Sequence, residues 1–273
     1  MIITPIERTE KETGGPLRTD RKEIRPLFDG KREVEPEGYW DVSGSTGWEA
    51  APPEGSKPSR YRVMSDAIRG FITPFEVLDS QAAKEQAGGD DDKGGVYFYP
   101  FNHGFCPIGD GDDDGDLNSA NFEEKMGQFE KDHFDSDGQP QGGTNIMEAV
   151  AAGDRHYMSE FGPGGENERP REQRPVRART VWTDGELKDA SAFGRYMEQS
   201  VVEHGVGVRK DWDEVWAVAI FGHGAEHDTT LNQYQELAKR HPNIHVYSFD
   251  QVRNGNEVAE DMAVAVVPGK ETA

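Results

Sequence analysis

The residues best suited to chemistry in this chain lie in a short oxygen-rich segment. From Asp41 to Thr46 the chain reads DVSGST, which combines one carboxylate with three hydroxyl groups. Such hard oxygen ligands suit Mg²⁺, Mn²⁺ or Ca²⁺ better than zinc or copper. A D-x-S-x-S pattern also arises by chance in chains of ordinary composition. The case for a metal site therefore depends on the segments that would position and complete it.

Two later segments carry polar residues that can join the first. A Gly-Gly pair precedes Thr144, which lies where a helix N-cap is expected. Asp184 follows a strand pattern at 176–182 and begins a turn. In an open α/β sheet, ligands gather at the carboxyl ends of the strands, where the strand order reverses. The sequence therefore predicts that Asp41, Thr144 and Asp184 meet at one edge of a sheet.

The segments between these residues alternate between strand and helix patterns. Strands are expected at residues 38–42, 96–101, 176–182, 215–221 and 244–249. Helices are expected at residues 59–86, 120–133, 144–158, 188–204, 231–240 and 256–264. This alternation predicts an α/β fold, namely a doubly wound, mostly parallel central sheet with helices on both faces and one antiparallel edge strand.

Proline and composition set the expected limits of these elements. Pro74 should kink or divide the first long helix, and a short strand at 105–108 should lie at the sheet edge, where proline is tolerated. We expect the domain to span residues 34–266. An extended or disordered arm is expected at 1–33, and a short tail at 267–273.

In order and type, the polar segments resemble the metal-ion-dependent adhesion site (MIDAS) of the von Willebrand factor A (vWA) domain. That site is written D-x-S-x-S, followed by a distant Thr, often in GGTNI, and an Asp in a TDG turn. This chain reads DVSGS at 41–45, GGTNI at 142–146 and TDG at 183–185. The resemblance covers about residues 36–265. The most similar members are the intracellular bacterial type associated with tellurium resistance and stress, although Thr46 replaces a usual Met that is not a ligand.

The resemblance implies a Rossmann-like vWA fold with a defined set of ligands. Ser43, Ser45 and Thr144 would offer hydroxyl oxygens to one Mg²⁺, or to Mn²⁺ or Ca²⁺. Asp41 and Asp184 would lie close by and act directly or through water. An ion held by mostly neutral ligands should accept a carboxylate from a partner protein. The implied function is metal-dependent protein binding in stress response or assembly, beside an AAA+ ATPase or other stress-response proteins.

Each segment also has a simpler structural interpretation, and an enzymatic alternative exists. The hydroxyls of residues 43–46 can bond to their own backbone, Thr144 can be only a helix cap, and Asp184 only a turn residue. The enzymatic alternative is a Mg²⁺-dependent phosphatase of the haloacid-dehalogenase type, in which Asp41 would attack phosphate. That family requires a second aspartate where this chain has Ser43. No motif places another catalytic set, and we expect no enzyme activity.

An acidic segment later in the chain is a weaker metal candidate. Asp110, Asp112 and Asp114 occupy positions 1, 3 and 5 of a pattern that resembles the start of an EF-hand loop, and Asp116 follows. Position 12 is Asn121 instead of the usual glutamate. The segment is therefore either a weak Ca²⁺ site in a calcium-responsive protein or a solvated acidic loop.

Charge and composition narrow the class of partner and the expected location. The chain has 273 residues and a formal net charge of −22, which disfavours nucleic acids and anionic membranes as partners. Its one cysteine, Cys106, excludes an intrachain disulfide, and its apolar surroundings predict that it is buried. No membrane-length apolar stretch or signal-peptide pattern is present. We therefore expect a soluble, cytoplasmic protein.

Overall fold

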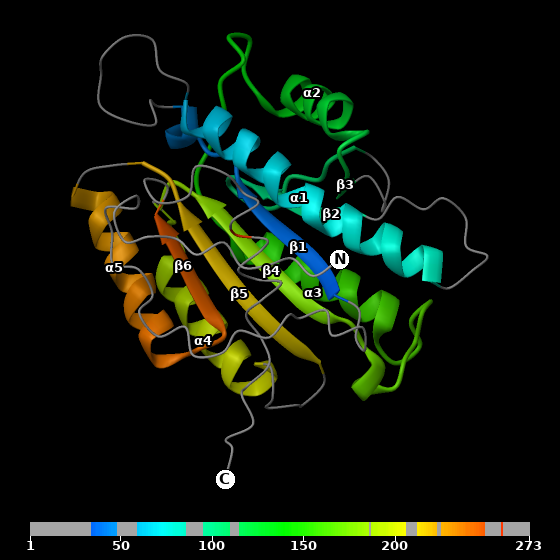
Figure 1. Cartoon of the computed structure of the whole chain (residues 1–273). Coiled ribbons are helices and arrows are strands. Elements are labelled where there is room, and N and C mark those ends of the chain that lie inside the picture. Colours follow the sequence, from blue (N-terminus) through cyan, green and yellow to red (C-terminus); the bar gives the residue numbers. More distant parts are fainter. Residues whose placement is uncertain are drawn as a thin grey trace, which may run out of the picture.

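The computed structural model of the chain is a central sheet covered by helices on both faces (Figure 1). It describes residues 34–47, 59–85, 95–109, 115–185, 187–205, 212–222, 225–248 and 258. The strands in these ranges are β1 (Val34–Asp41), β2 (Val96–Phe101), β3 (Asp116–Leu117), β4 (Val176–Thr183), β5 (Asp213–Ile220) and β6 (Ile244–Ser248).

The strand order is β3-β2-β1-β4-β5-β6. All neighbouring strands are parallel except β2 and β3, which pair antiparallel at one edge. In this order the sheet grows in one direction from β1 to β3 and in the other from β4 to β6, so the strand order reverses between β1 and β4. The predicted fold class is confirmed, including the doubly wound, mostly parallel sheet and its antiparallel edge strand.

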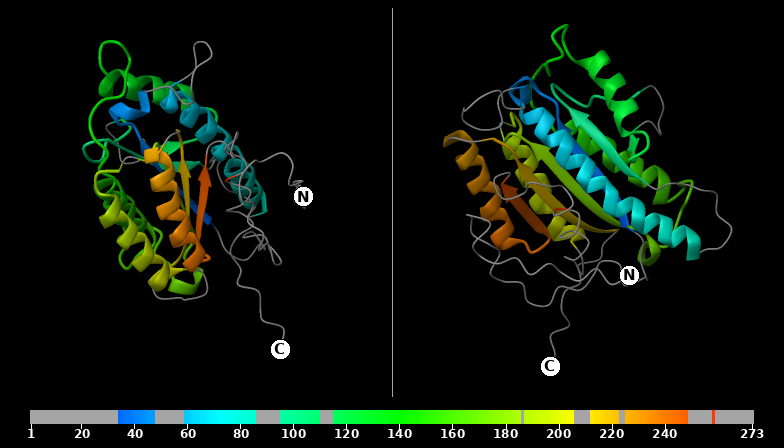
Figure 2. Two further views of the ribbon diagram at one scale, coloured as in Figure 1. Left: turned by 90° about the vertical axis from the view of Figure 1, so that its left-hand side faces the viewer. Right: turned by 45° about the horizontal axis from the view of Figure 1, so that its top comes forward.

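The helices divide between the two faces of the sheet, as the views in Figure 2 show. Helices α1 (Arg60–Glu85) and α2 (Phe122–His133) cover one face, where Phe71 of α1 packs on Trp182 of β4. The other face is covered by α3 (Met147–Phe161), α4 (Ala190–His204) and α5 (Ala225–Arg240). Phe193 of α4 packs there on Trp216 of β5. Each face thus has its own apolar core.

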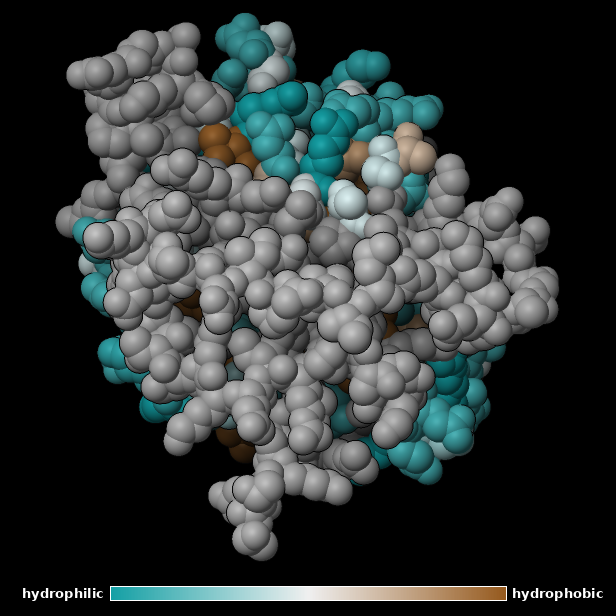
Figure 3. Space-filling view, viewed as in Figure 1, coloured by the Kyte–Doolittle hydropathy of each residue, from teal (hydrophilic) through white to brown (hydrophobic). Residues whose placement is uncertain are grey.

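Two short 3₁₀ helices complete the described elements, η1 (Gly44–Gly47) and η2 (Arg171–Gln173). Hydrophilic residues dominate the described surface in the view of Figure 3, as the high content of charged residues leads one to expect. Within the described ranges, no helix combines the length and apolarity needed to cross a membrane. The predicted burial of Cys106 is confirmed, and burial raises the pKa of its thiol to about 11.

Strand β1 is longer than predicted, because it begins at Val34 and passes through Pro36. Pro36 faces Ala178 of β4, whereas the described register with β2 begins one residue later, at Glu37. The missing N–H of a proline is tolerated where a strand is paired on one side only. The charge of Glu37 is compatible with the strand because Arg177 of β4 pairs with it, Nε to Oε1, at 2.5 Å.

The structure changes two further predictions about the elements, and a third lies almost entirely outside the described residues. The strand predicted at 105–108 is reduced to a single antiparallel bridge between Phe105 and Phe101, next to which the Cys106 N–H donates to the Pro100 carbonyl at 2.8 Å. The edge strand that pairs with β2 is β3. Pro74 does not divide α1, which runs through it as one helix. The helix predicted at 256–264 lies outside the described residues except for Val258, which is helical and buried.

Candidate metal centre

Asp41 is the last residue of β1, and its side chain is fully buried. One carboxylate oxygen accepts the Ser43 N–H at 3.0 Å and the other accepts the Thr183 hydroxyl at 2.7 Å. Burial and the nearby carboxylate of Asp184 raise the pKa of Asp41 to about 7, against the effect of these hydrogen bonds. A cation beside Asp41 would favour its ionised form.

Two hydroxyl groups face each other in the loop after β1. The Oγ atoms of Ser43 and Ser45 lie 3.2 Å apart. Two adjacent ligands in an octahedron with bonds of about 2.1 Å are separated by about 3.0 Å, so this spacing fits one edge of a Mg²⁺ or Mn²⁺ coordination sphere. The Thr46 hydroxyl instead donates to the Ser43 carbonyl at 2.7 Å and closes the 3₁₀ turn. The simpler turn interpretation therefore holds for Thr46.

The loop that carries Thr144 lies against this first loop. The Gly44 N–H donates to the Gly142 carbonyl at 3.3 Å, a backbone hydrogen bond between segments far apart in sequence. Gly142 has a φ of +94°, which favours glycine. Thr144 is buried, and its carbonyl accepts the Lys188 N–H at 3.0 Å. The structure therefore brings Thr144 towards the Ser43–Ser45 loop, as predicted.

The prediction that Thr144 caps the following helix is wrong. Helix α3 begins at Met147, after Ile146 as its N-cap residue. The two N–H groups there donate to the Asp189 carboxylate, from Ile146 at 3.2 Å and from Met147 at 3.0 Å. A carboxylate from the segment before α4 thus caps α3, and the sequence around Thr144 gives no indication of it.

Asp184 directly follows β4, and its side chain is fully buried. Strand β4 pairs with β1, so Asp184 and Asp41 leave neighbouring strands at the point where the strand order reverses. Gly185 follows with a φ of +98° and makes the turn. Arg60, which the sequence analysis did not single out, donates to Asp184 from Nη1 to Oδ2 at 3.2 Å.

Two basic side chains border these loops. The exposed imidazole of His103 accepts the Gly143 N–H through Nδ1 at 3.1 Å. The Lys188 side chain is also exposed, and its Nζ would lie 2.7 Å from a Cβ placed on Gly143. In the described part of the chain, no carboxylate is paired with Lys188. The rim therefore presents hydrogen-bond donors and positive charge next to the buried carboxylates.

The structure places the five predicted site residues in adjoining segments at the carboxyl edge of the sheet: β1 and β4 are paired, and the Ser43–Ser45 loop is hydrogen-bonded to the loop that carries Thr144. They supply three hydroxyls and two carboxylates, a donor set that fits a hard divalent cation and not zinc. No group of three or more His, Cys, Asp or Glu side chains is placed to hold a metal within the described ranges. A metal at this site would therefore depend on the hydroxyl ligands.

Most of the predicted calcium loop cannot be placed. Asp110, Asp112 and Asp114 lie outside the described residues. Asp116 is part of β3, and its carbonyl accepts hydrogen bonds from the side chains of Asn121 and Lys125. Calcium binding by this loop stays a prediction.

The comparisons with known proteins bear on the fold. No protein-family model matches the sequence, and no curated protein is significantly similar to it. The manganese-loaded TRAP protein of Plasmodium vivax is structurally similar, with a TM-score of 0.50 and 13% sequence identity, and the match covers 86% of this chain and 75% of TRAP.

Two other solved structures match at lower scores. An aerotolerance-related membrane protein of Bacteroides fragilis matches with a TM-score of 0.45 and 18% sequence identity. That match covers 85% of this chain and 98% of the other chain. A von Willebrand factor type A protein of Catenulispora acidiphila matches with a TM-score of 0.43 and 14% sequence identity. That match covers 85% of this chain and 41% of the other chain. At these sequence identities a structural match indicates a shared fold and nothing further. Of the three matches, we use only the one to TRAP, whose TM-score is 0.50, as support for the fold.

The chain has a Rossmann-like vWA fold. Its strand order, its antiparallel edge strand and the helices on both faces of its sheet are consistent with this fold. In this fold the candidate metal centre occupies the carboxyl edge of the sheet, where β1 and β4 separate.

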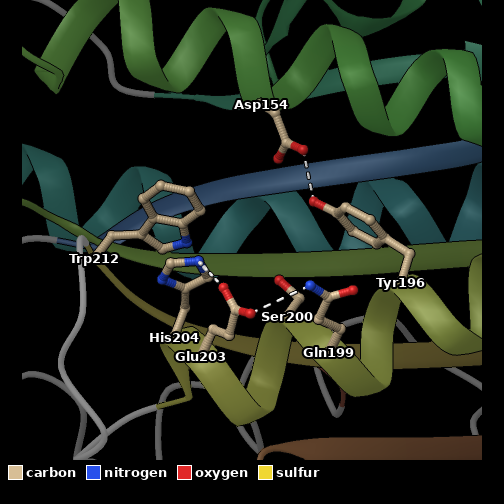
Figure 4. Close-up of a pocket in the computed structure, with 7 residues that line it drawn as sticks. All are labelled: Asp154, Tyr196, Gln199, Ser200, Glu203, His204 and Trp212. Carbon is tan, nitrogen blue, oxygen red and sulfur yellow. Dashed lines mark hydrogen bonds and ion pairs between the residues drawn. The ribbon is translucent and has the colours of Figure 1, made fainter.

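A surface pocket of about 200 Å³ lies at the opposite edge, near the start of β5, and contains none of the predicted metal ligands (Figure 4). Its polar groups are engaged with one another: the Tyr196 hydroxyl donates to Asp154 at 2.6 Å, and the His204 ring stacks on Trp212. The pocket is lined by Asp154, Tyr196, Gln199, Ser200, Glu203, His204 and Trp212.

Beneath this pocket lies a buried ion-pair network that the sequence analysis missed. Arg177 and Arg179 of β4 are fully buried and pair with Glu37 of β1, Glu214 of β5 and Asp154 of α3. Burial alone would raise the pKa of Glu214, but Arg179 and Arg177 hold that pKa below its ordinary value. The available indication was the charged residues at alternate positions of β1 and β4, Glu35 and Glu37 in one strand and Arg177 and Arg179 in the other.

Proposed function

We propose that this protein is a metal-dependent protein-binding module. Ser43, Ser45 and Thr144 would hold one Mg²⁺, Mn²⁺ or Ca²⁺, and Asp41 and Asp184 would act directly or through water. The observation that carries the proposal is the pair of serine hydroxyls 3.2 Å apart beside a buried aspartate at the strand-order reversal. When bound, the ion supplies an open coordination position for a carboxylate oxygen of a partner.

The remaining residues of the site prepare it for such a ligand. The Thr183 hydroxyl and the Ser43 N–H orient the Asp41 carboxylate. The hydrogen bond from Ser43 would also limit the motion of the loop that follows Asp41. Lys188 and His103 at the rim would attract a carboxylate-bearing partner despite the overall charge of −22. The manganese-loaded TRAP protein offers support, as a protein of similar fold that carries a divalent metal ion.

We further propose that the module is not an enzyme and works in the cytoplasm. In the phosphatase alternative a second aspartate would follow Asp41 by two residues, but Ser43 stands there and donates its N–H to Asp41. The partner would be a protein of a stress-response or assembly system, such as an AAA+ ATPase. This part rests on the resemblance of residues 101–102, 142–146 and 183–185 to intracellular vWA proteins of the tellurium-resistance type.

Thermal unfolding in Mg²⁺ and in EDTA tests the metal site. Mg²⁺ should raise the Tm of the wild-type protein, since a ligand that binds only the folded state stabilises it. Thr144→Ala should remove this rise, whereas Thr144→Ser, which keeps the hydroxyl, should retain most of it. A wild-type Tm that is the same in Mg²⁺, Mn²⁺, Ca²⁺ and EDTA would refute the proposal.

The binding and catalytic functions are separated by two further measurements. Mass spectrometry of proteins that co-purify in Mg²⁺ but not in EDTA should identify a partner, and Thr144→Ala should lose it. Hydrolysis of a chromogenic phosphate ester should be absent. Hydrolysis by the wild type that disappears in Asp41→Asn would support the phosphatase instead.

A further inference from the structure

Arg60 places a buried positive charge directly on the candidate metal centre. It is the first residue of α1, and only 9% of its side chain is exposed. Its Nη1 lies 3.2 Å from Oδ2 of Asp184, whose side chain is fully buried. An arginine in contact with a proposed metal-site carboxylate is unusual, because the guanidinium and the metal ion seek the same negative charge.

The surroundings of Arg60 are shaped to hold the guanidinium in this place. Gly222, just beyond β5, has a φ of +119°, and a Cβ placed on it would lie 3.2 Å from both Cζ and Nε of Arg60. The residue before it, Phe221, donates its N–H to the Thr183 carbonyl at 2.8 Å and thereby fixes this turn against the end of β4. A glycine at position 222 therefore leaves room for the guanidinium beside Asp184.

The charge of Arg60 cannot be removed by loss of a proton, because guanidinium groups stay ionised in proteins. In the metal-free protein Arg60 compensates the negative charge of Asp184. A divalent cation held beside Asp184 would be opposed by the same fixed charge, because a buried site screens charges poorly.

We propose that Arg60 acts as a built-in competitor of the metal ion for Asp184, and that it sets the metal affinity of the site. This inference rests on the proposed metal-binding function. The alternative role for Arg60 is to position the Asp184 carboxylate for the metal ion, which would strengthen metal binding. The two roles predict effects of opposite sign when the guanidinium is removed.

Calorimetric titration with Mn²⁺ of the wild type, Arg60→Met and Arg62→Met distinguishes these roles. Methionine keeps much of the apolar stem and removes the charge. Arg62 is a matched control on the same turn of α1, since its exposed side chain pairs only with Asp66, at 3.9 Å, among the described residues. We expect Arg60→Met to bind Mn²⁺ on the order of tenfold more tightly than wild type, which corresponds to about 1.4 kcal/mol. Arg62→Met should bind as the wild type does.

The outcomes separate failure of this inference from failure of the proposed function. Equal or weaker Mn²⁺ binding by Arg60→Met, with normal binding by wild type, overturns the competitor role. Absence of Mn²⁺ binding by all three proteins, each shown to be folded by circular dichroism, overturns the metal site itself and with it this inference. Should Arg60→Met fail to fold, Arg60→Gln, which keeps a hydrogen-bond donor without the charge, decides between the same two outcomes.

Discussion

Asp41 shows at the scale of a single residue how a buried carboxylate beside another carboxylate can destabilise a fold. Its side chain is buried near the carboxylate of Asp184, and its pKa is raised to about 7. A carboxyl group whose folded-state pKa is raised favours the protonated folded state. Its ionisation therefore destabilises the fold progressively as the pH rises from its ordinary pKa near 3.8 to about 7. Residues of functional sites commonly lower the stability of the fold that carries them.

Asp41→Asn should therefore stabilise the protein when no metal is present. The amide is neutral and can still accept the Ser43 N–H. At pH 8 in EDTA we expect the free energy of unfolding to rise by on the order of 2–4 kcal/mol, as a shift of about three pKa units implies. The gain should shrink as the pH falls towards 4, and urea unfolding at several pH values measures it. A variant less stable than wild type at pH 8 in EDTA would contradict this interpretation.

At the scale of elements, the position of Thr144 depends on a contact between two helices. The Asp189 carboxylate, just before α4, accepts the N–H groups of Ile146 and Met147 at the start of α3. The neighbouring Lys188 N–H binds the Thr144 carbonyl. The segment before α4 thus holds both the first turn of α3 and the loop that carries the candidate ligand.

Asp189→Ala should weaken both stability and metal binding. Loss of a capping carboxylate costs about 1–2 kcal/mol, and the loosened Thr144 loop should raise the Kd for Mn²⁺ several-fold. Chemical unfolding and calorimetric titration measure the two effects. Asp189→Asn, which keeps one acceptor oxygen, should lie between alanine and wild type. Full stability of the alanine variant would show that the cap is replaced by solvent.

At the scale of the whole molecule, a buried ion-pair network joins three strands and two helices. Arg177 and Arg179 bridge Glu37, Glu214 and Asp154 across β1, β4, β5 and α3, and the Tyr196 hydroxyl of α4 contacts Asp154. Glu214 also accepts hydrogen bonds from Ser200, Trp212 and Trp216. Removing one partner from such a network leaves a buried charge uncompensated, which is strongly destabilising.

Glu214→Gln should lower the free energy of unfolding by about 3–5 kcal/mol at pH 7. The pKa of Glu214 in the folded protein lies below its ordinary value near 4.5. Its contribution is therefore present above that pH and lost as the pH falls through the folded-state pKa. Urea unfolding between pH 7 and pH 3 should show a smaller loss of stability on acidification in the variant than in wild type.

An exposed glutamate provides the control for this prediction. Glu236 pairs with Lys239 on the surface of α5, so Glu236→Gln should change stability by less than about 1 kcal/mol. Equal effects of Glu214→Gln and Glu236→Gln would contradict the structural importance of the network.

The alternation of strands and helices is predictable from the sequence alone, and the candidate ligands are predictable from a resemblance of short motifs. The set of Asp41, Ser43, Ser45, Thr144 and Asp184 is what the resemblance of three motifs to the MIDAS implies, and these motifs lie next to the ends of predicted strands and helices. Local periodicity and turn chemistry depend on neighbours in the chain, and both are therefore visible in sequence. The strand order then supplied the edge at which the ligands meet.

Only the tertiary structure decided which distant partners these residues have. Arg60 lies 124 residues from Asp184, and Glu37 lies 140 residues from Arg177. The Arg60–Asp184 pairing leaves no local pattern. The alternating charges of β1 and β4 mark charged strand positions, but they do not show which distant residues pair with them. The capping of α3 by Asp189, and the passage of β1 through Pro36, likewise depend on which neighbours the fold supplies. The physical reason is that pairing and burial are properties of three-dimensional proximity, and a single sequence records them only indirectly.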